Sequence, residues 1–329
     1  MSSSELGKFL QECCILVITL FLIACSNTET ENMLPETDGH IGFGVTVPTT
    51  SRTLISEANQ MGSFKVWGWR TPQNQAVKGQ VFNGTTVSYN ENSAQHWTYS
   101  PLQSWVLYNS YDFYALYPDT LSGANYNETG QLTFDRLDIR QSGEYSTDYA
   151  LDVMHARQVV TVATTPPDRV LLTFDHLLTN VNISLQMDGS NGGDEMVVTN
   201  ILLNGMNCVG PMQAGTWNTS EPSYLWDMLD TPQTLEVGNP KTCFANVLMI
   251  PQILAEGQVT LYVVYNYKQQ NSATATTKIL QTTLPASEWV SGEKINYTGT
   301  IKVDNTLVFD TPQVESWGTE QVGGTVVIK

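Results

Sequence analysis

A strict alternation of side chains occupies residues 41–47, which read Ile41-Gly42-Phe43-Gly44-Val45-Thr46-Val47. Apolar residues take the odd positions, and glycine or threonine takes the even ones. Because successive side chains of a strand point to opposite faces, Ile41, Phe43, Val45 and Val47 share one face. The stretch therefore predicts a short strand with a single apolar face, suited to filling a groove between other strands.

The rest of the chain repeats this β pattern. Runs rich in β-branched and aromatic residues are separated by Gly, Asn, Asp and Pro, which is typical of short strands joined by turns. The only candidate for a short helix is Tyr224 to Leu229. The clearest runs are 64–69, 159–163, 170–174, 181–185, 259–267 and 295–303. The sequence thus predicts an all-β fold of sandwiches or barrels.

Chain length and one proline-rich segment indicate two domains. At roughly 150 residues per domain, the 329 residues suffice for two separate cores. The best linker is Thr164-Thr165-Pro166-Pro167-Asp168, because adjacent prolines cannot continue a central strand. We expect an N-terminal sandwich over residues 41–165 and a C-terminal sandwich over residues 166–329.

The charge balance excludes one class of partner. The chain has 15 Lys and Arg against 32 Asp and Glu, a formal net charge of −17. Such an acidic surface repels phosphate groups, so nucleic acid is not expected as a partner. Only 14% of the residues are charged, and the 39 threonines supply polarity that suits half-buried β surfaces.

The N-terminus has the pattern of an export signal. Cys13 to Ala24 is an uncharged run of 12 residues, too short to cross a bilayer, which takes about 20 residues. The run ends in Leu22-Ile23-Ala24-Cys25, which resembles the bacterial lipobox. We expect a lipoprotein signal peptide over residues 1–24, lipid on Cys25, and a flexible acidic tether over residues 25–40. The alternatives are an ordinary signal peptide or a buried apolar strand.

Patterns for catalysis or metal binding are absent from the sequence. The four histidines lack metal-ligand spacing, and there is no Cys-x-x-Cys pair, nucleophile elbow or phosphate-binding loop. Nothing marks Asp135 and Asp138 as an acid–base pair, and His176 has the setting of a structural histidine. We expect no catalytic residue, metal or cofactor. In the exported chain, Cys208 and Cys243 either pair or remain two buried thiols.

Aromatic residues are concentrated between residues 64 and 118. If exposed, they would form a stacking platform for sugars; if they alternate on strands, they pack a sandwich core. We favour the core and keep the platform as the alternative. The ten residues are Trp67, Trp69, Trp97, Tyr99, Trp105, Tyr108, Tyr111, Phe113, Tyr114 and Tyr117.

Short motifs spread over about residues 41 to 317 occur in an order that resembles one family. They are Phe64-Lys65-Val66-Trp67-Gly68, His96-Trp97-Thr98-Tyr99-Ser100-Pro101, Trp105, Tyr111-Asp112-Phe113-Tyr114-Ala115-Leu116-Tyr117-Pro118, Asp148 to Ala156, Leu172 to Leu178, Leu248 to Gln252, Trp289 to Lys294, Tyr297-Thr298 and Trp317. On these residues the chain resembles the fimbrillin-like (FimA/Mfa-like) family of Bacteroidetes type V pilins. These pilins resemble proteins exported as outer-membrane lipoproteins, in keeping with the lipobox.

The resemblance implies two tandem antiparallel β-sandwich domains of Greek-key, transthyretin-like topology and assembly into a fimbria by strand exchange. In such pilins a trypsin-like protease cuts after an arginine beyond the first strand, and the vacated groove accepts a C-terminal strand of the next subunit. The corresponding residues here are Arg52, the displaced strand of Ile41, Phe43, Val45 and Val47, and donor residues Val322, Val326 and Ile328 within a tail over residues 318–329.

Apart from the resemblance, Arg52 and the C-terminal tail are themselves compatible with cleavage and strand exchange. Arg52 is the only Lys or Arg between Lys8 and Lys65, so a trypsin-like enzyme meets a single target there. The 12 residues after Trp317 can extend about 40 Å at roughly 3.3 Å each. The alternatives are an ordinary loop arginine at position 52 and a tail that forms the last edge strand of its own sandwich.

The sequence therefore predicts a structural, non-enzymatic precursor of a cell-surface fimbria at the outer membrane, joined to copies or paralogues of itself. The alternative is a monomeric surface lipoprotein that binds glycan through exposed aromatics. Two further alternatives are an accessory, anchor or tip subunit with a host ligand and an extracellular hydrolase. Asp119-Thr120-Leu121 also resembles the short sites that Bacteroidetes O-glycosylate.

Overall fold

The computed structural model describes residues 39–47, 57–139, 152–189, 193–218, 226–227 and 231–317. Their regular structure is β, apart from the single 3₁₀ turn η1 (Ala58–Met61). The predicted all-β fold is therefore confirmed. The short helix suggested for Tyr224 to Leu229 is wrong at its centre, where β15 (Trp226–Asp227) is a strand.

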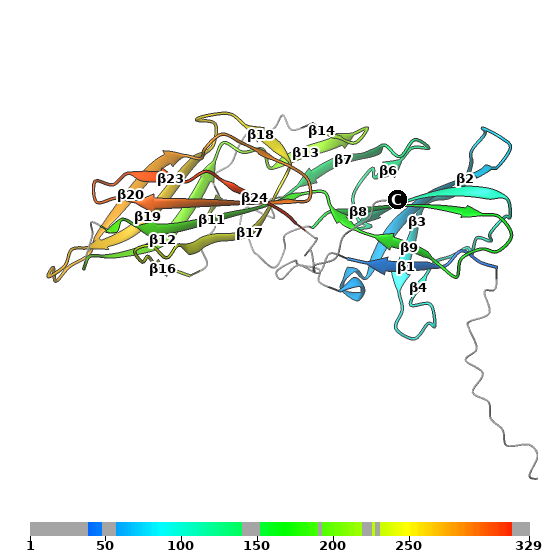
Figure 1. Ribbon diagram of the computed structural model, residues 1–329, viewed down its shortest axis with the longest axis horizontal. Coiled ribbons are helices and arrows are strands. Elements are labelled where there is room, and N and C mark those ends of the chain that lie inside the picture. Colours follow the sequence, from blue (N-terminus) through cyan, green and yellow to red (C-terminus); the bar gives the residue numbers. More distant parts are fainter. Residues whose placement is uncertain are drawn as a thin grey trace, which may run out of the picture. The chain divides into compact units, whose positions relative to one another are not determined.

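A six-stranded sheet organises the N-terminal part of the chain (Figure 1). Neighbouring strands in it are antiparallel, as the turn-rich sequence predicts. Its order is β10 (Asp175–His176), β8 (Met154–Val162), β5 (Asn109–Tyr117), β2 (Ser63–Pro72), β3 (Gly79–Tyr89) and β4 (Trp97–Thr98).

Both faces of this sheet contribute to buried clusters. On β5, Tyr111 and Phe113 belong to one cluster, whereas Tyr114 and Leu116 belong to the other. Apolar residues consequently occupy both parities of the strand, as expected where neither face meets water. The first cluster includes residues of β1 (Phe43–Thr46) and β9 (Val170–Thr173), and the second includes residues of β6 (Asn125–Tyr126) and β7 (Leu132–Asp138).

Two five-stranded sheets form most of the C-terminal part. The first contains β17 (Lys241–Met249), β11 (Thr179–Met187), β22 (Glu293–Ile301) and β23 (Leu307–Phe309), with β24 (Gln313–Ser316) on β22. The second contains β15, β12 (Glu195–Asn204), β19 (Thr260–Lys268) and β20 (Thr276–Thr283), with β16 (Gln233–Thr234) on β12. A separate pair is made by β18 (Gln252–Leu254) and β21 (Ser287–Trp289).

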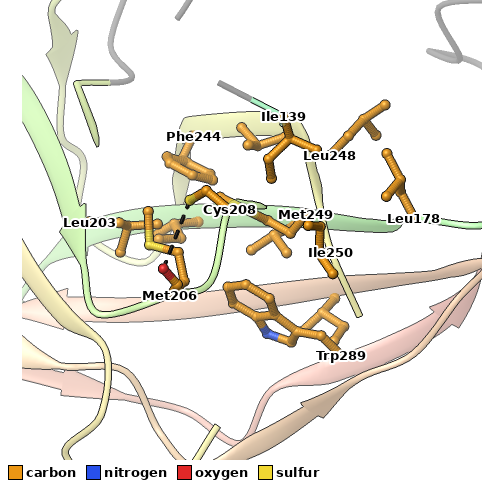
Figure 2. Close-up of a cluster of buried hydrophobic side chains, with 14 of the residues drawn as sticks. Ile139, Leu178, Leu203, Met206, Cys208, Phe244, Leu248, Met249, Ile250 and Trp289 are labelled. Carbon is orange, nitrogen blue, oxygen red and sulfur yellow. Dashed lines mark hydrogen bonds between the residues drawn. The ribbon is translucent and has the colours of Figure 1, made fainter. Parts of the chain in front are cut away.

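Alternate residues of these sheets join one large buried cluster. On β19, for example, Leu261, Val263 and Tyr265 have no exposed surface, whereas the residues between them are partly exposed. This is the period-two pattern that the run 259–267 predicts. Figure 2 shows another part of the cluster, where Met206, Cys208 and Trp289 lie among aliphatic side chains.

Some strand pairings cross the boundary that the sequence predicts between residues 165 and 166. Strands β9 and β10 follow that boundary, yet they pair with β1 and β8. In addition, β7 pairs with β13 (Val209–Gln213), in a four-stranded sheet that ends in β14 (Thr216–Trp217) and β6. The boundary stays a prediction, and the pairing of β9 and β10 favours a position after His176.

The predicted antiparallel sandwiches contain two parallel strand pairs. β1 runs parallel to β9, and β11 runs parallel to β22. Parallel neighbours require long crossover connections, which join segments far apart in the sequence. Local alternation cannot reveal such a connection, because it reports the strand and not its partner.

Candidate functional site

The segment Ile41–Val47, here called the plug, is held by one ladder of backbone hydrogen bonds. Among the described strands, β9 is the only one that pairs with β1, the strand of the plug. The amide of Val170 donates to the carbonyl of Gly42 at 2.8 Å, and the amide of Phe174 donates to that of Thr46 at 3.0 Å. The strand covers Phe43–Thr46, somewhat less than the predicted range 41–47.

Phe43 is surrounded by aromatic rings beneath the plug. Its side chain has no exposed surface, and its ring centroid lies 5.5 Å from Phe82, 5.6 Å from Tyr99, 6.0 Å from Phe113 and 6.5 Å from Phe64. All four pairs have edge-to-face geometry, which contributes about 0.5–1.5 kcal/mol per pair beyond burial. Removing this ring would open an apolar slot in the cluster.

The other apolar residues of the plug extend this contact. Ile41 is 1% exposed and Val47 is 9% exposed, while Val45 is partly buried against the same cluster. All four residues predicted for a displaced strand therefore face one core. The prediction of a single apolar face is confirmed at these positions.

A loop holds the first residue of the plug. The amide of Ile41 donates to the carbonyl of Gln103 at 2.8 Å, and the hydroxyl of Tyr99 donates to the carbonyl of Ile41 at 2.7 Å. His40 Nδ1 lies 3.1 Å from Ser104 Oγ. The loop over residues 99–104 thus closes one end of the groove that the plug occupies.

The outer face of the plug needs small residues. A Cβ atom added at Gly44 would lie 2.8 Å from both Arg169 Cδ and Leu171 Cδ2, and one at Gly42 would lie 3.1 Å from Gln95 Oε1. Glycine at these two positions lets neighbouring side chains fold over the backbone of the plug. The third outward residue, Thr46, donates its hydroxyl hydrogen bond to Thr173 Oγ1 at 3.0 Å.

A hollow lies beside the plug. Its volume is about 350 Å³. The carboxylate of Glu57 lies just before η1, the guanidinium of Arg169 lies just before β9, and the aromatic rings come from β3, β4 and the turn between them. The lining residues are Gly44, Val45, Glu57, Ala58, Asn59, Tyr89, Gln95, His96, Trp97 and Arg169.

The root of the predicted donor tail lies next to the six-stranded sheet. Trp317 follows β24, and its amide donates to the carbonyl of Gly292 at 2.7 Å. Its indole, 6% exposed, stacks on the ring of His176 in β10. Trp317 thus contacts a residue that follows Thr173, the last residue of the strand that holds the plug, by three positions.

His176 has the structural setting that the sequence favours. Its Nδ1 lies 2.8 Å from Asp152 Oδ1, and both side chains are buried. A buried histidine that is oriented by a carboxylate and covered by an indole has no open face for a substrate. The geometry accounts for His176 as a packed residue at the base of the tail.

The platform of exposed aromatics is not formed. Trp67, Trp69, Trp97, Tyr111, Phe113 and Tyr114 are buried, and Tyr99, Trp105 and Tyr117 are partly buried. Only Tyr108, at 57%, is an exposed member of the ten. The core interpretation of these residues is therefore confirmed, and the glycan platform loses its structural basis.

Other candidates from the sequence have ordinary roles in the described residues. Cys208 and Cys243 are buried thiols that form no disulfide with each other, and burial raises the pKa of Cys243 to about 12. Figure 2 shows Cys208, whose Sγ is directed at the carbonyl of Met206 at 3.9 Å. Asp138 pairs with Arg136 at 3.2 Å. In the described ranges no cluster of His, Cys, Asp and Glu has the arrangement of a metal site.

Several predicted residues lie outside the described ranges. They are Cys25, Arg52, Val322, Val326 and Ile328, together with the signal peptide and nearly all of the tether. Thr120 of the suggested O-glycosylation site is exposed. No helix within the described ranges is long and apolar enough to cross a membrane.

Sequence reasoning missed the residues that hold the plug. Tyr99 and Gln103 bind Ile41 through backbone groups and a hydroxyl, and Leu171 covers Gly44 from a strand far away in sequence. The glycines at alternate positions of 41–47 were a usable signal, because strand glycines often mark a close approach of another group.

These observations define a class of protein: an all-β protein of several sheets, in which a short first strand with one strand neighbour fills a slot lined by aromatic rings. The fold is that of known fimbrial proteins. A fimbrial protein from Bacteroides vulgatus has a TM-score of 0.65 with 17% identity over 84% of this chain and 99% of that chain. A candidate cell adhesion protein from Bacteroides ovatus has a TM-score of 0.51 with 13% identity over 85% and 98% of the two chains.

The fimbrillin-like family model matches residues 51–317, so the chain belongs to the fimbrillin-like family. The resemblance drawn from the sequence motifs is thereby confirmed. Among curated proteins there is no match to this chain. Membership of the fimbrillin-like family indicates a fimbrial protein of the cell surface that assembles with other fimbrial subunits.

Proposed function

We propose that this chain is a pilin precursor, a structural subunit exported as a lipoprotein on Cys25 and joined to copies or paralogues by strand exchange. The observation that carries the proposal is the position of Phe43. This residue is fully buried among four aromatic rings, yet it sits on a four-residue strand with one strand neighbour among those described. A strand that is so short and has so few backbone partners, yet buries a large ring, is suited to being displaced by another strand.

Removal of the plug would leave two unsatisfied features. The aromatic slot beneath Phe43 would meet water, and the backbone groups of β9 that face β1 would lose their partners. An incoming strand with alternating apolar residues satisfies both, because main-chain hydrogen bonds give affinity and the slot accepts side chains. We propose Val322, Val326 and Ile328 as the apolar face of that strand.

Cleavage after Arg52 is the proposed trigger. While the chain is intact, residues 48–57 connect the plug covalently to η1, which keeps the plug at a high effective concentration beside its groove. After cleavage, the plug is held only by non-covalent contacts, so a neighbour's strand can compete for the groove. The same cut separates the subunit from the lipid on Cys25.

Limited proteolysis of the full exported chain tests this proposal. Trypsin should remove the residues up to Arg52 first, and the product should form oligomers of increasing size at high concentration. The matched control is Arg52→Gln, which should keep the plug and remain monomeric under the same treatment. A cleaved product that stays monomeric at high concentration would overturn the proposal.

Lipid attachment has its own test. Cells that express the intact precursor should incorporate labelled palmitate and retain the protein in the outer-membrane fraction. Cys25→Ser should abolish labelling and release the protein from that fraction. Equal labelling of both variants would show that Cys25 is not the acceptor.

A further inference from the structure

One loop of the N-terminal part exposes four large apolar side chains. Leu102 is 56% exposed, Val106 41%, Leu107 42% and Tyr108 57%. These four residues, here called the apical patch, lie within seven consecutive positions between β4 and β5. Contiguous patches of exposed apolar residues on soluble proteins often mark interaction surfaces.

The backbone of the loop is fixed by hydrogen bonds. The amide of Val106 donates to the hydroxyl of Tyr111 at 2.7 Å, and Asn109 Nδ2 donates to the carbonyl of Leu107 at 2.9 Å. The carbonyl of Tyr108 accepts the amide of Gln73 at 3.0 Å. The apolar side chains are therefore presented by a preorganised surface, which lowers the entropic cost of binding.

The apical patch adjoins the groove. Gln103, directly after Leu102, accepts the amide of Ile41 at 2.8 Å, and Ser104 contacts His40. The loop that carries the patch is thus the loop that closes one end of the groove. A strand that replaces the plug would lie against the same loop.

The proposed donor strand has a short reach. Five residue steps separate Trp317 from Val322, and a fully extended chain covers about 17 Å over that distance. Since Trp317 is packed on His176, the body of a donor subunit has to lie against the acceptor at the end of its groove. An inserted strand alone cannot connect two subunits that do not touch.

We propose that the apical patch docks a second copy of this chain at the root of its donated tail. This inference rests on the proposed strand exchange and names the surface that assists it. On the donor side, Val314, 55% exposed, precedes Trp317 by three positions, and Val290, 37% exposed, precedes by two positions Gly292, whose carbonyl accepts the Trp317 amide. Apolar contact between these two surfaces would hold the subunits together while the strand enters the groove.

The experiment separates docking from strand binding. The docking variant is Leu107→Ser with Tyr108→Asn, because asparagine tolerates the positive φ of 58° at position 108. The matched control is Ile279→Ser, which removes a 64% exposed apolar residue on β20. Each protein is treated with trypsin and followed by light scattering, and its binding of a synthetic peptide of residues 318–329 is measured by fluorescence anisotropy.

We expect the docking variant to bind the peptide as the wild type does and to form oligomers about tenfold more slowly. The Ile279→Ser control should match the wild type in both measurements. If the docking variant forms oligomers at the wild-type rate while it binds peptide, the docking surface is wrong and strand exchange stands. If the cleaved wild type binds no peptide and forms no oligomer, strand exchange itself fails, and the docking inference fails with it.

Discussion

The indole of Trp317 lies flat on the imidazole of His176, with 3.6 Å between ring centroids and 6° between ring planes. The imidazole is held from its edge by Asp152, at 2.8 Å. This stack joins the end of the described C-terminal part to β10 of the six-stranded sheet. It sets the point from which the proposed donor tail departs.

Trp317→Ala is expected to destabilise the protein strongly. The indole is 6% exposed, and truncating a buried Trp costs about 3–5 kcal/mol. The free energy of unfolding is measured by urea denaturation. Val314→Ala, on the exposed face of the neighbouring strand, is the control and should change stability by less than about 0.5 kcal/mol. Equal effects of the two changes would show that the stack contributes little.

Phe43→Asp is expected to prevent stable folding of the precursor. The carboxylate would replace a fully buried ring among four aromatic side chains, with no partner for its charge. Solubility and a thermal melting curve report the outcome. Thr46→Asp places the same charge on the exposed face of the same strand, so it should leave a soluble, cooperatively melting protein. A normal melting curve for Phe43→Asp would contradict the placement of the plug.

Gly44→Ala is expected to destabilise the precursor through close contacts with two side chains. The added Cβ would lie 2.8 Å from Leu171 Cδ2 and from Arg169 Cδ. Both atoms belong to flexible side chains that can turn aside, so we expect a loss of at most about 1 kcal/mol. Leu171 is 59% exposed, so Leu171→Ala alone should cost little.

The double variant Gly44→Ala, Leu171→Ala tests the cause of that loss. Removing the leucine side chain should recover part of the stability, with a coupling energy of at least about 0.5 kcal/mol in the double-mutant cycle. Urea denaturation of the four proteins provides the cycle. Additive effects would mean that the contact with Leu171 is not the cause of the loss.

His155 is expected to make the protein less stable in mild acid. Burial lowers the pKa of His155 below its usual 6.5, while the nearby charge of Asp175 opposes this shift. As pH falls below 6.5, the unfolded chain binds a proton before the folded protein does, so the free energy of unfolding decreases. The histidine is neutral in both states well above 6.5, where this contribution to the pH dependence vanishes.

The comparison of His155→Gln with the wild type isolates this effect. Urea denaturation at pH 7.5 and pH 5.5 should show a smaller loss of stability in the variant than in the wild type. His96→Gln, at an exposed position, is the control and should retain the wild-type loss. The same loss in all three proteins would exclude His155 as the cause.

The aromatic residues show where local reasoning is limited. Alternation over 41–47 and 259–267 correctly predicts which side chains are buried, because one face of each run meets a core. In β5, residues of both parities are buried, since the sheet has a cluster on each face. Composition alone therefore could not distinguish a buried core from an exposed platform in the aromatic-rich region.

The sequence by itself determined the β class, the apolar face of the plug and the order of motifs that resembles the fimbrillin-like family. Those features depend on neighbouring residues, because the two-residue period of a strand is a property of the local backbone. Only the tertiary structure decided that β1 runs parallel to β9, that Leu171 covers Gly44, and that Trp317 stacks on His176. These contacts join residues far apart in the chain, and their selection depends on the burial and loop closure of the whole fold.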